Sequence, residues 1–151
     1  MGIQQGILIG IARREKTRAP MEEIESALVT TKSGIEKDFR GKPGNRQITI
    51  LAEEDWESAC KTMEKNLPWT LRRANLLVKG IKLQETTDSL IQIGNLTLQV
   101  TGETDPCSRM DEEVPGLTKA LLPDWRGGVL CRVIADGKIS LGNQVTLETP
   151  K

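Results

Sequence analysis

The feature that most constrains the fold of this chain is a series of short apolar stretches separated by glycine, proline, asparagine and aspartate. Alternation of apolar and polar side chains predicts strands over residues 3–12, 24–31, 47–51, 75–79, 89–101, 127–134 and 139–148. Gly94-Asn95 divides the stretch 89–101 into a hairpin, and Asp136-Gly137 predicts a turn at 135–138. Many short strands with frequent turn residues are typical of a β-rich α+β domain, which we predict to be a barrel.

Helical periodicity is clearest over residues 53–66. Trp56, Ala59, Cys60 and Met63 repeat at the spacing that puts side chains on one face of a helix. A second, short helix is predicted over 114–123. The 151 residues are enough for one hydrophobic core, so we predict a single domain over 1–151 with two or three peripheral helices.

The residue types that are missing exclude several kinds of chemistry. The sequence has no histidine and no tyrosine. It therefore has no Ser-His-Asp triad, no Cys-His dyad and no histidine-ligated zinc site. Any reaction must use Cys, Asp, Glu, Lys, Arg, Ser or Thr, or a bound cofactor.

The charge balance and the cysteines indicate the surroundings of the protein. Lys plus Arg equals Asp plus Glu at 21 each, so no basic excess favours nucleic acid as a partner. No apolar run approaches the roughly 18 residues of a membrane span, so we expect no membrane partner either. Three cysteines without secretory context predict reduced thiols and a cytoplasmic location.

The three cysteines lie in different sequence environments. Cys60 is on the apolar face of the predicted helix, and Cys131 alternates with Val129 and Val133 on one strand face, so both are expected to be buried. Cys107 belongs to the aperiodic, charged stretch "TGETDPCSRMDEEVPG" over 101–116. Its thiol is expected to be at least partly exposed, and nearby arginines would stabilise its thiolate.

Arginines recur beside glycines and at strand starts. Arg46 ends the glycine-rich basic loop 33–46, Arg73 lies in "RRAN", and Arg126 precedes Gly127 and Gly128. A guanidinium offers a rigid fork for phosphate or carboxylate, and a glycine backbone allows an anion to approach closely. We expect Arg46, Arg73 and Arg126 to converge on one side of the fold. Taken singly, each cluster is also compatible with a solvated surface.

The motifs, in order, resemble those of the MOSC domain, the C-terminal module of molybdenum-cofactor sulfurases. The resemblance extends from about residue 5 to 148 and is carried by "SGIEKDFRG", "RQITIL", "RRANLLVKGI", "IGNLTLQVT", "DPCSRM", "RGGVLCRVI" and "GKISLGNQVTL". MOSC domains also occur in amidoxime-reducing enzymes and as small stand-alone bacterial proteins. The resemblance implies a MOSC-type β-barrel and a molybdenum cofactor of the molybdopterin type.

The resemblance also implies roles for individual residues. Cys107, in the family's Pro-Cys position, would ligate molybdenum through its thiolate or carry sulfur as a persulfide. Asp38 matches an acidic position of the early loop and would act with Cys107 as a catalytic residue that orients substrate or water. These roles agree with the chemistry of the residues, because a thiolate is a soft ligand that suits a transition metal.

The cofactor-binding residues implied by the resemblance are basic or amide side chains. Arg73 and Asn75 match an Arg-x-Asn pattern near the cofactor of the reductases, and Arg46 matches a basic position of the early loop. Arg126 is predicted to join them at the same site. Such side chains would suit the phosphate of the pterin.

Two functions from different classes follow from this reading. The first is a molybdenum-cofactor-binding protein that catalyses or supports the two-electron reduction of N-hydroxylated compounds. The second is a non-catalytic carrier of the cofactor, or of sulfur as a Cys107 persulfide; a thiol redox sensor that uses Cys107 alone is a third hypothesis. No flavin, haem or iron–sulfur motif is present, so we expect an external electron-donor reductase or a cofactor-delivery partner.

Overall fold

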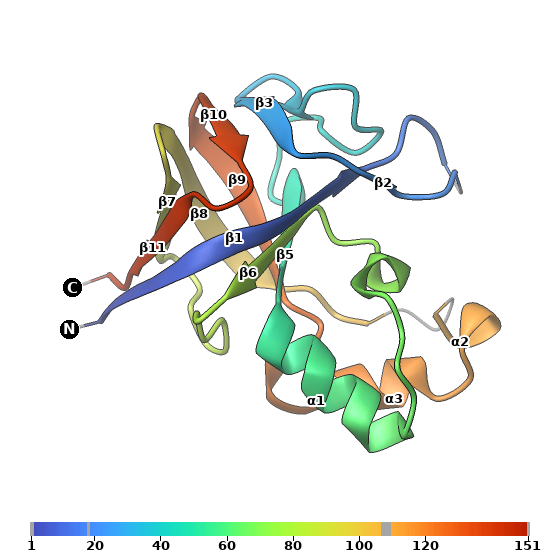
Figure 1. Ribbon diagram of the computed structural model, residues 1–151. Coiled ribbons are helices and arrows are strands. Elements are labelled where there is room, and N and C mark those ends of the chain that lie inside the picture. The colour runs from blue at the N-terminus through green and yellow to red at the C-terminus, as the bar shows by residue number, and fades with distance from the viewer. Residues whose placement is uncertain (1, 18, 107–109, 151) are drawn as a thin grey trace.

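The computed structural model describes residues 2–17, 19–106 and 110–150 and confirms the predicted β-rich α+β barrel. Within these residues, seven strands follow one another around a closed sheet (Figure 1). Their order around the barrel is β11 (Gln144–Glu148), β7 (Leu90–Ile93), β8 (Leu96–Glu103), β9 (Val129–Ala135), β5 (Ile48–Ala52), β6 (Leu76–Lys79) and β1 (Ile3–Arg13).

Strand β1 closes the barrel because it pairs with different strands along its length. Its first part is antiparallel to β11, with Ile3 opposite Glu148 and Ile7 opposite Gln144. Its middle is antiparallel to β6, and its last residues pair with the short strand β2 (Glu22–Glu23). Figure 1 shows β1 crossing the molecule from the two termini, which lie side by side, to the opposite end of the barrel. This closure leaves neither β1 nor β11 as a free sheet edge over the paired residues.

Strands β5 and β6 form the parallel pair of the barrel, and their connection supplies the helical layer. The chain leaves β5, forms helix α1 (Glu53–Met63) and the 3-10 helix η1 (Trp69–Arg72), and returns to β6. Helices α2 (Met110–Glu113) and α3 (Leu117–Leu121) and the 3-10 helix η2 (Pro123–Trp125) lie between β8 and β9. Figure 1 shows α1 and α3 packed together at one end of the barrel.

A small second sheet explains one difference from the sequence prediction. It consists of β10 (Gly137–Ser140), β3 (Ser26–Thr30) and β4 (Gly34–Ile35). The predicted turn at 135–138 does not fold β9 back into a hairpin. The chain instead passes from β9 into β10, which pairs with β3, and the Asp136 carboxylate accepts a hydrogen bond from the backbone N–H of Thr31.

Two other predicted elements differ in extent. The predicted helix over 114–123 is shorter in the structure, where α3 covers only Leu117–Leu121 and is preceded by Gly116 in a left-handed conformation with φ 92°. Helix α2 (Met110–Glu113) lies before the predicted range. Helix α1 ends at Met63 rather than at residue 66, because the next residue, Glu64, adopts a left-handed conformation with φ 56°. The predicted hairpin at Gly94-Asn95 is confirmed, since β7 pairs antiparallel to β8 across this turn.

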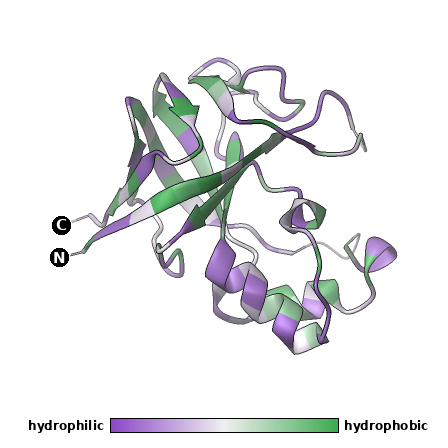
Figure 2. Ribbon diagram, viewed as in Figure 1, coloured by the Kyte–Doolittle hydropathy of each residue, from purple (hydrophilic) through white to green (hydrophobic). Residues whose placement is uncertain are grey.

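The core has two parts that share the backbone of β5 and β6. Ile50 and Leu76 face the barrel interior, whereas Leu51 and Leu77 face the other way and pack under the helices with Trp56. Both faces of these strands are therefore covered, which is why β5 is apolar at four of its five positions rather than alternating. In Figure 2, apolar colour prevails along β5 and the middle of β1, whereas α1 carries both polar and apolar colour.

The two cysteines expected in the core are buried. Cys131 is fully buried in the barrel, and burial raises the pKa of its thiol. Cys60 packs in the helical part of the core. Cys107 lies outside the described residues. No helix in the described part of the chain has the length and hydropathy needed to cross a bilayer.

The loop between β4 and β5 is held in place by a buried glutamine. Gln47 Nε2 donates hydrogen bonds to the carbonyl oxygens of Thr31 at 2.8 Å and Gly41 at 3.1 Å. Its Oε1 accepts a hydrogen bond of 2.9 Å from the backbone N–H of Val133 on β9. The Gln47 side chain is 2% exposed, and its hydrogen bonds to protein groups connect the loop to the barrel.

We predict that Gly41→Ala lowers the free energy of unfolding by about 1–3 kcal/mol. A Cβ at Gly41 would overlap the carbonyl oxygen of Ser33, and backbone on both sides would have to move. Gly102→Ala is the matched control, because a Cβ there meets nothing within 4 Å. Urea unfolding of both variants measures the difference, and equal stabilities would contradict the packing described for this loop.

Candidate functional site

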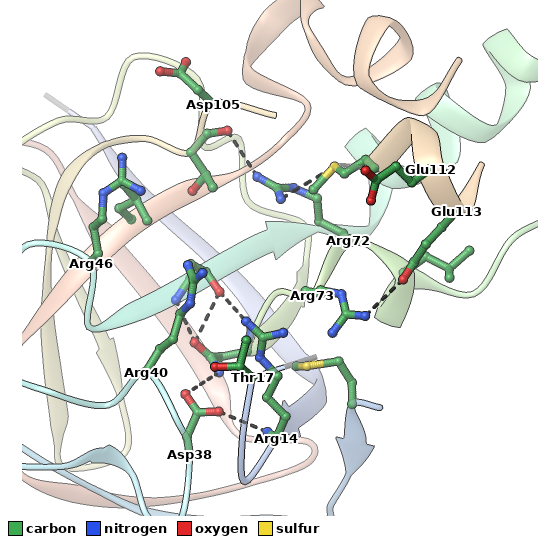
Figure 3. Close-up of a pocket in the computed structure, with 17 residues that line it drawn as sticks. Arg14, Thr17, Asp38, Arg40, Arg46, Arg72, Arg73, Asp105, Glu112 and Glu113 are labelled. Atoms are coloured by element: carbon green, nitrogen blue, oxygen red, sulfur yellow. Dashed lines mark hydrogen bonds and ion pairs between the residues drawn. The ribbon is translucent and has the colours of Figure 1, made fainter. Parts of the chain in front are cut away.

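A cavity of about 710 Å³ lies at the end of the barrel that β1 reaches (Figure 3). Its walls come from segments far apart in the sequence: the residues after β1, the β4–β5 loop, η1, the end of β8 and helix α2. The residues that line it are Arg14, Thr17, Met21, Asp38, Arg40, Arg46, Thr49, Leu71, Arg72, Arg73, Asn75, Thr104, Asp105, Met110, Glu112, Glu113 and Leu130.

Asn75 organises one wall of the cavity. It is buried, and its Oδ1 accepts hydrogen bonds from the backbone N–H of Thr49 at 3.0 Å and from the Thr49 hydroxyl at 3.2 Å. Its Nδ2 donates to the carbonyl oxygen of Ala12 at 3.2 Å and to Asp38 Oδ2 at 3.3 Å. Asn75 therefore links β5, β1 and the β4–β5 loop at one point.

The Asp38 carboxylate is fixed through both of its oxygens. Oδ2 accepts the bond from Asn75, and Oδ1 accepts a hydrogen bond of 3.1 Å from the backbone N–H of Arg14. Asp38 is half-buried in the cavity wall. These bonds set the direction in which the carboxylate faces the cavity, so it can accept a further hydrogen bond from a ligand without reorganising.

Arg72 supports the opposite wall. It is buried, and its Nε donates to the carbonyl oxygen of Gly127 at 2.9 Å while Nη2 donates to the carbonyl oxygen of Thr104 at 3.2 Å. Its Nη1 lies 3.9 Å from the sulfur of Met110. Arg72 thus contacts the backbone before residue 106 and a side chain after residue 109, the two described sides of the segment that contains Cys107.

Arg73 is the arginine of the cavity that forms an ion pair within the described residues. Its Nη2 lies 3.0 Å from Oε1 of Glu113 on α2, and its Nη1 donates to the carbonyl oxygen of Ala19 at 3.2 Å. Its backbone adopts a left-handed conformation with φ 63° at the end of η1. Both partners are partly exposed, so the pair itself contributes little to stability.

Three further arginines leave their guanidinium groups open to the cavity. In the described part of the structure, no hydrogen bond or ion pair engages the guanidinium of Arg14, Arg40 or Arg46. Burial and the neighbouring charges of Arg40 and Arg73 lower the pKa of Arg14, and Asp38 opposes this effect. The cavity wall is therefore electropositive around Arg14 and suits an anion.

The structure brings together four of the residues predicted to form a site. Asp38, Arg46, Arg73 and Asn75 all line the cavity. Cys107, predicted as the metal ligand and catalytic thiol, lies outside the described residues. Its described neighbours in sequence, Asp105 and Met110, line the same cavity.

Arg126 corrects the expectation of one shared site, because it does not line the cavity. Its Nη1 donates hydrogen bonds of 3.1 Å to the Thr62 hydroxyl on α1 and to the carbonyl oxygen of Ala120 on α3. Arg126 therefore bridges the two helices. Arg126 and Arg46 both lie near glycines in the sequence, and this pattern does not distinguish an arginine that bridges two helices from one that contacts a ligand.

Three other arginines of the cavity were not predicted as site residues. Arg40 and Arg72 lie in the basic stretches described above, whereas Arg14 lies outside them. The available signal was the pair Arg13-Arg14 directly after the apolar stretch 3–12, at the end of a predicted strand. Only the folded structure shows that this strand end meets the β4–β5 loop, through the hydrogen bond from the backbone N–H of Arg14 to Asp38.

A second cavity of about 410 Å³ lies beside the start of α1 and includes Glu54, Asp55, Lys82 and Asp124. Burial is the main reason that the pKa of Asp55 rises to about 6; Glu54 adds to the rise, Arg126 opposes it and Asp124 adds again. Among the described residues, no group of three or more Cys, Asp and Glu side chains has the arrangement of a metal site. The described residues therefore contain no metal site built from such side chains alone, and this includes the second cavity.

Comparisons with known proteins agree with the architecture. The sequence profile of the MOSC domain matches residues 36–146, which is more than half of the chain. Comparison with curated protein sequences gives no significant match. Among solved structures, the YuaD protein from Bacillus subtilis matches with a TM-score of 0.85 at 18% identity, covering 99% of each chain.

Two further solved structures share the fold. YiiM from Escherichia coli matches with a TM-score of 0.73 at 16% identity, covering 96% of this chain and 71% of that one. YiiM from Geobacillus stearothermophilus gives 0.69 at 17% identity, covering 95% and 73%. At these identities the likeness concerns the fold.

We predict that Asn75→Leu lowers the free energy of unfolding by about 1–3 kcal/mol, because the backbone N–H of Thr49 loses the acceptor provided by the side chain. It also removes the hydrogen bond to Asp38. Asn45→Leu, at an exposed loop position, is the control and is expected to stay within about 0.5 kcal/mol of the parent. Denaturant unfolding of the two variants measures the difference. If Asn75→Leu is as stable as Asn45→Leu, the Asn75 side chain does not hold β5 and the β4–β5 loop together.

The raised pKa of Asp55 predicts a pH-dependent effect of Asp55→Asn. Its pKa lies near 6 in the folded protein against an ordinary value of 3.8, so protonation favours the folded state. This contribution is complete below about pH 3.8 and is lost as the pH rises through 6. The parent should therefore lose about 1 kcal/mol relative to the variant between pH 4 and pH 7.5, after allowance for solvent screening of a partly exposed group. A difference between variant and parent that stays constant over this range would contradict the assignment.

Proposed function

This chain belongs to the MOSC domain family, and on that premise we propose that it binds a molybdenum cofactor of the molybdopterin type in the 710 Å³ cavity. The observation that carries the proposal is the meeting of Asp38, Arg46, Arg73 and Asn75 at one cavity, although they come from separate segments of the chain. Residues on both described sides of the Cys107 segment line this same cavity.

The side chains of the cavity fit the chemistry of such a cofactor. A volume of about 710 Å³ lies within the range of roughly 300–1,000 Å³ that is usual for small-molecule and cofactor sites. The open guanidinium groups of Arg14, Arg40 and Arg46 suit the phosphate of a pterin cofactor, since guanidinium binds phosphate through two parallel hydrogen bonds.

We assign roles as follows. Arg46, Arg73 and Asn75 would hold and orient the cofactor, and the Cys107 thiolate would be its soft protein ligand. When bound, the cofactor would supply the two-electron redox chemistry that this histidine-free chain lacks. Arg126 has no part in this proposal, because it bridges α1 and α3.

Asp38 would act on the substrate rather than on the cofactor. Because its carboxylate is oriented by Asn75 and by the backbone of Arg14, it can accept a hydrogen bond from the hydroxylamine or hydroxyl group of a bound compound. Reduction of an N-hydroxylated compound consumes two electrons and two protons and releases water. The electrons would come from an external reductase, and the setting we propose is the cytoplasm.

A carrier function is the second candidate. Arg40 and Arg46 are exposed, so a ligand held by their guanidinium groups could leave without a rearrangement of the barrel. In this role the protein would bind the cofactor, or sulfur as a Cys107 persulfide, and pass it to a delivery partner. Turnover of an N-hydroxylated base with a chemical electron donor separates the enzyme from the carrier.

We predict that Cys107→Ser abolishes metal retention, and with it N-hydroxy reduction or sulfur transfer, without unfolding the protein. A hydroxyl has nearly the size of a thiol, but it rarely becomes the anionic soft ligand that a thiolate provides. The measurements are bound molybdenum per chain after expression in a molybdenum-replete host, turnover, and thermal unfolding.

The matched control is Cys60→Ser, which places a hydroxyl in the buried helical core. It is expected to lower the free energy of unfolding by about 1–3 kcal/mol while the folded fraction keeps its metal. If Cys107→Ser retains normal molybdenum content and activity, the thiol is incidental and the proposed role of Cys107 is wrong.

A further inference from the structure

The outer face of the barrel over the first part of β1 and over β11 and β7 carries almost no charge. The segments that pair there are "IQQGI" at 3–7, "QVTLE" at 144–148 and "LIQI" at 90–93, and their one charged residue is Glu148. In the whole chain 28% of the residues are charged, so a surface this poor in charge stands apart from the rest of the molecule. We call the outward-pointing residues of these three segments the neutral face.

Three large apolar side chains are exposed on the neutral face. In β7 and β11 every second residue is buried in the barrel, so the residues between them point outward. Ile3 is 66% exposed, Ile7 50% and Leu90 44%. Ile3 and Leu90 lie on either side of Glu148, because both are opposite this residue in the sheet. The helices pack on β5 and β6 instead and leave this side of the barrel uncovered (Figure 1).

The other polar side chains of the neutral face are amides and a hydroxyl. Gln5, Thr146 and Gln92 form one row across β1, β11 and β7, and Gln144 is opposite Ile7. An amide both donates and accepts hydrogen bonds, and no protein group engages the amides of Gln5, Gln92 or Gln144 within the described residues. Such groups can pair with their own copies across a symmetric contact, whereas a charged group would repel its own copy.

Charged side chains begin at the borders of the neutral face. On β6, Lys79 is opposite Ile7. On β9, Arg132 is opposite Gln99 of β8, the strand next to β7. An apolar and uncharged centre with a charged rim is the composition of a protein–protein interface. The same lack of charge gives a nucleic acid, an anionic membrane or a strongly charged protein no electrostatic attraction to this face.

We propose that the neutral face is the contact surface of a two-fold symmetric dimer and that its occupant is a second copy of this chain. A two-fold axis along the row of Gln5, Thr146 and Gln92 places each of these residues opposite its own copy, so the amides can bond reciprocally. Ile3 then faces Ile7 of the second copy, because both lie two residues from Gln5 on β1.

The same axis gives the one charge of the neutral face a suitable partner. Glu148 and Gln144 both lie two residues from Thr146 on β11, so each Glu148 faces Gln144 of the second copy. An amide N–H can donate a charge-assisted hydrogen bond to that carboxylate. The two carboxylates do not face each other, and the dimer therefore contains no like-charge contact at its centre.

The size of the neutral face sets the strength of the dimer. Three strands lie about 4.8 Å apart, and the five paired residues of β1 rise about 3.4 Å each, which places the contact at the low end of specific interfaces. The dimer is therefore concentration-dependent. It also leaves both cavities of the pair open, because the 710 Å³ cavity begins with Arg14, beyond the other end of β1. The inference does not depend on what this cavity binds.

Sedimentation equilibrium of the full chain tests the proposal. We expect a monomer–dimer equilibrium with a Kd on the order of 10–100 µM. Ile7→Lys should raise the Kd at least about tenfold, because an ammonium group would have to be buried against Ile3 of the second copy. The matched control is Leu28→Lys, which changes a 45% exposed apolar side chain on β3, outside the neutral face, and should leave the Kd within about twofold of the parent.

Two charge substitutions at residue 144 test the proposed axis. Gln144→Lys should lower the Kd about threefold or more, because its ammonium would face Glu148 of the second copy. Gln144→Glu should raise the Kd by a similar factor at neutral pH, because two carboxylates would then face each other. Both effects should shrink at high salt. A merely structural effect of residue 144 would not change sign with the charge, and thermal unfolding of each variant verifies that it is folded.

A parent chain that stays monomeric up to about 1 mM overturns the proposal, since even a small specific interface would associate at that concentration. A dimer whose Kd responds neither to Ile7→Lys nor to the two changes at Gln144 also overturns it, because the contact would then lie on another face. Assemblies larger than a dimer contradict it as well, since a two-fold contact closes on itself.

Discussion

The pairing of β1 with β11 is the constraint on which the rest of the structure depends. It joins the first and last strands of the barrel, and because β1 continues past β11 to pair with β6 and then β2, it also carries the chain to the far end. Arg14 and the hydrogen bond from its backbone to Asp38 lie where β1 leaves the sheet. The path of β1 around the closed barrel therefore determines where the cavity lies.

The cavity joins a rigid frame to an unbalanced set of charges. Gln47, Asn75 and Arg72 are buried polar residues whose hydrogen bonds end on backbone carbonyls, N–H groups or neighbouring side chains, so they fix the loops around the cavity. In contrast, the guanidinium groups of Arg14 and Arg40 line the cavity, and neither forms an ion pair within the described structure. Rigid walls with unpaired charge are what a binding site requires, since reorganisation on binding is then small.

Sequence reasoning succeeded where local pattern decides structure. Alternation of apolar and polar residues located the barrel strands, and the helical spacing of Trp56 and Cys60 located α1. Both patterns arise because an element that buries one face repeats apolar residues at its own period. It failed where distant segments meet. Asp136-Gly137 predicted a turn at 135–138, yet the chain passes there from β9 into β10, which pairs with β3 in another sheet. Likewise the glycines beside Arg126 could not reveal its contact with Thr62, which depends on how α1 packs against α3.

The long β1–β11 pairing also has a consequence for how the protein is made. Gly2 and Thr149 exchange hydrogen bonds although they are 147 positions apart in the chain. Contacts of such sequence separation form slowly, because the entropy of closing the loop must be overcome before the pairing stabilises it. During synthesis, β1 emerges from the ribosome long before β11 exists, with apolar residues such as Ile11 and the edge that will face β11 still unpaired. The barrel can close only after translation of β11, and until then the edge of β1 that will pair with β11 is open to wrong pairing or to chaperone binding.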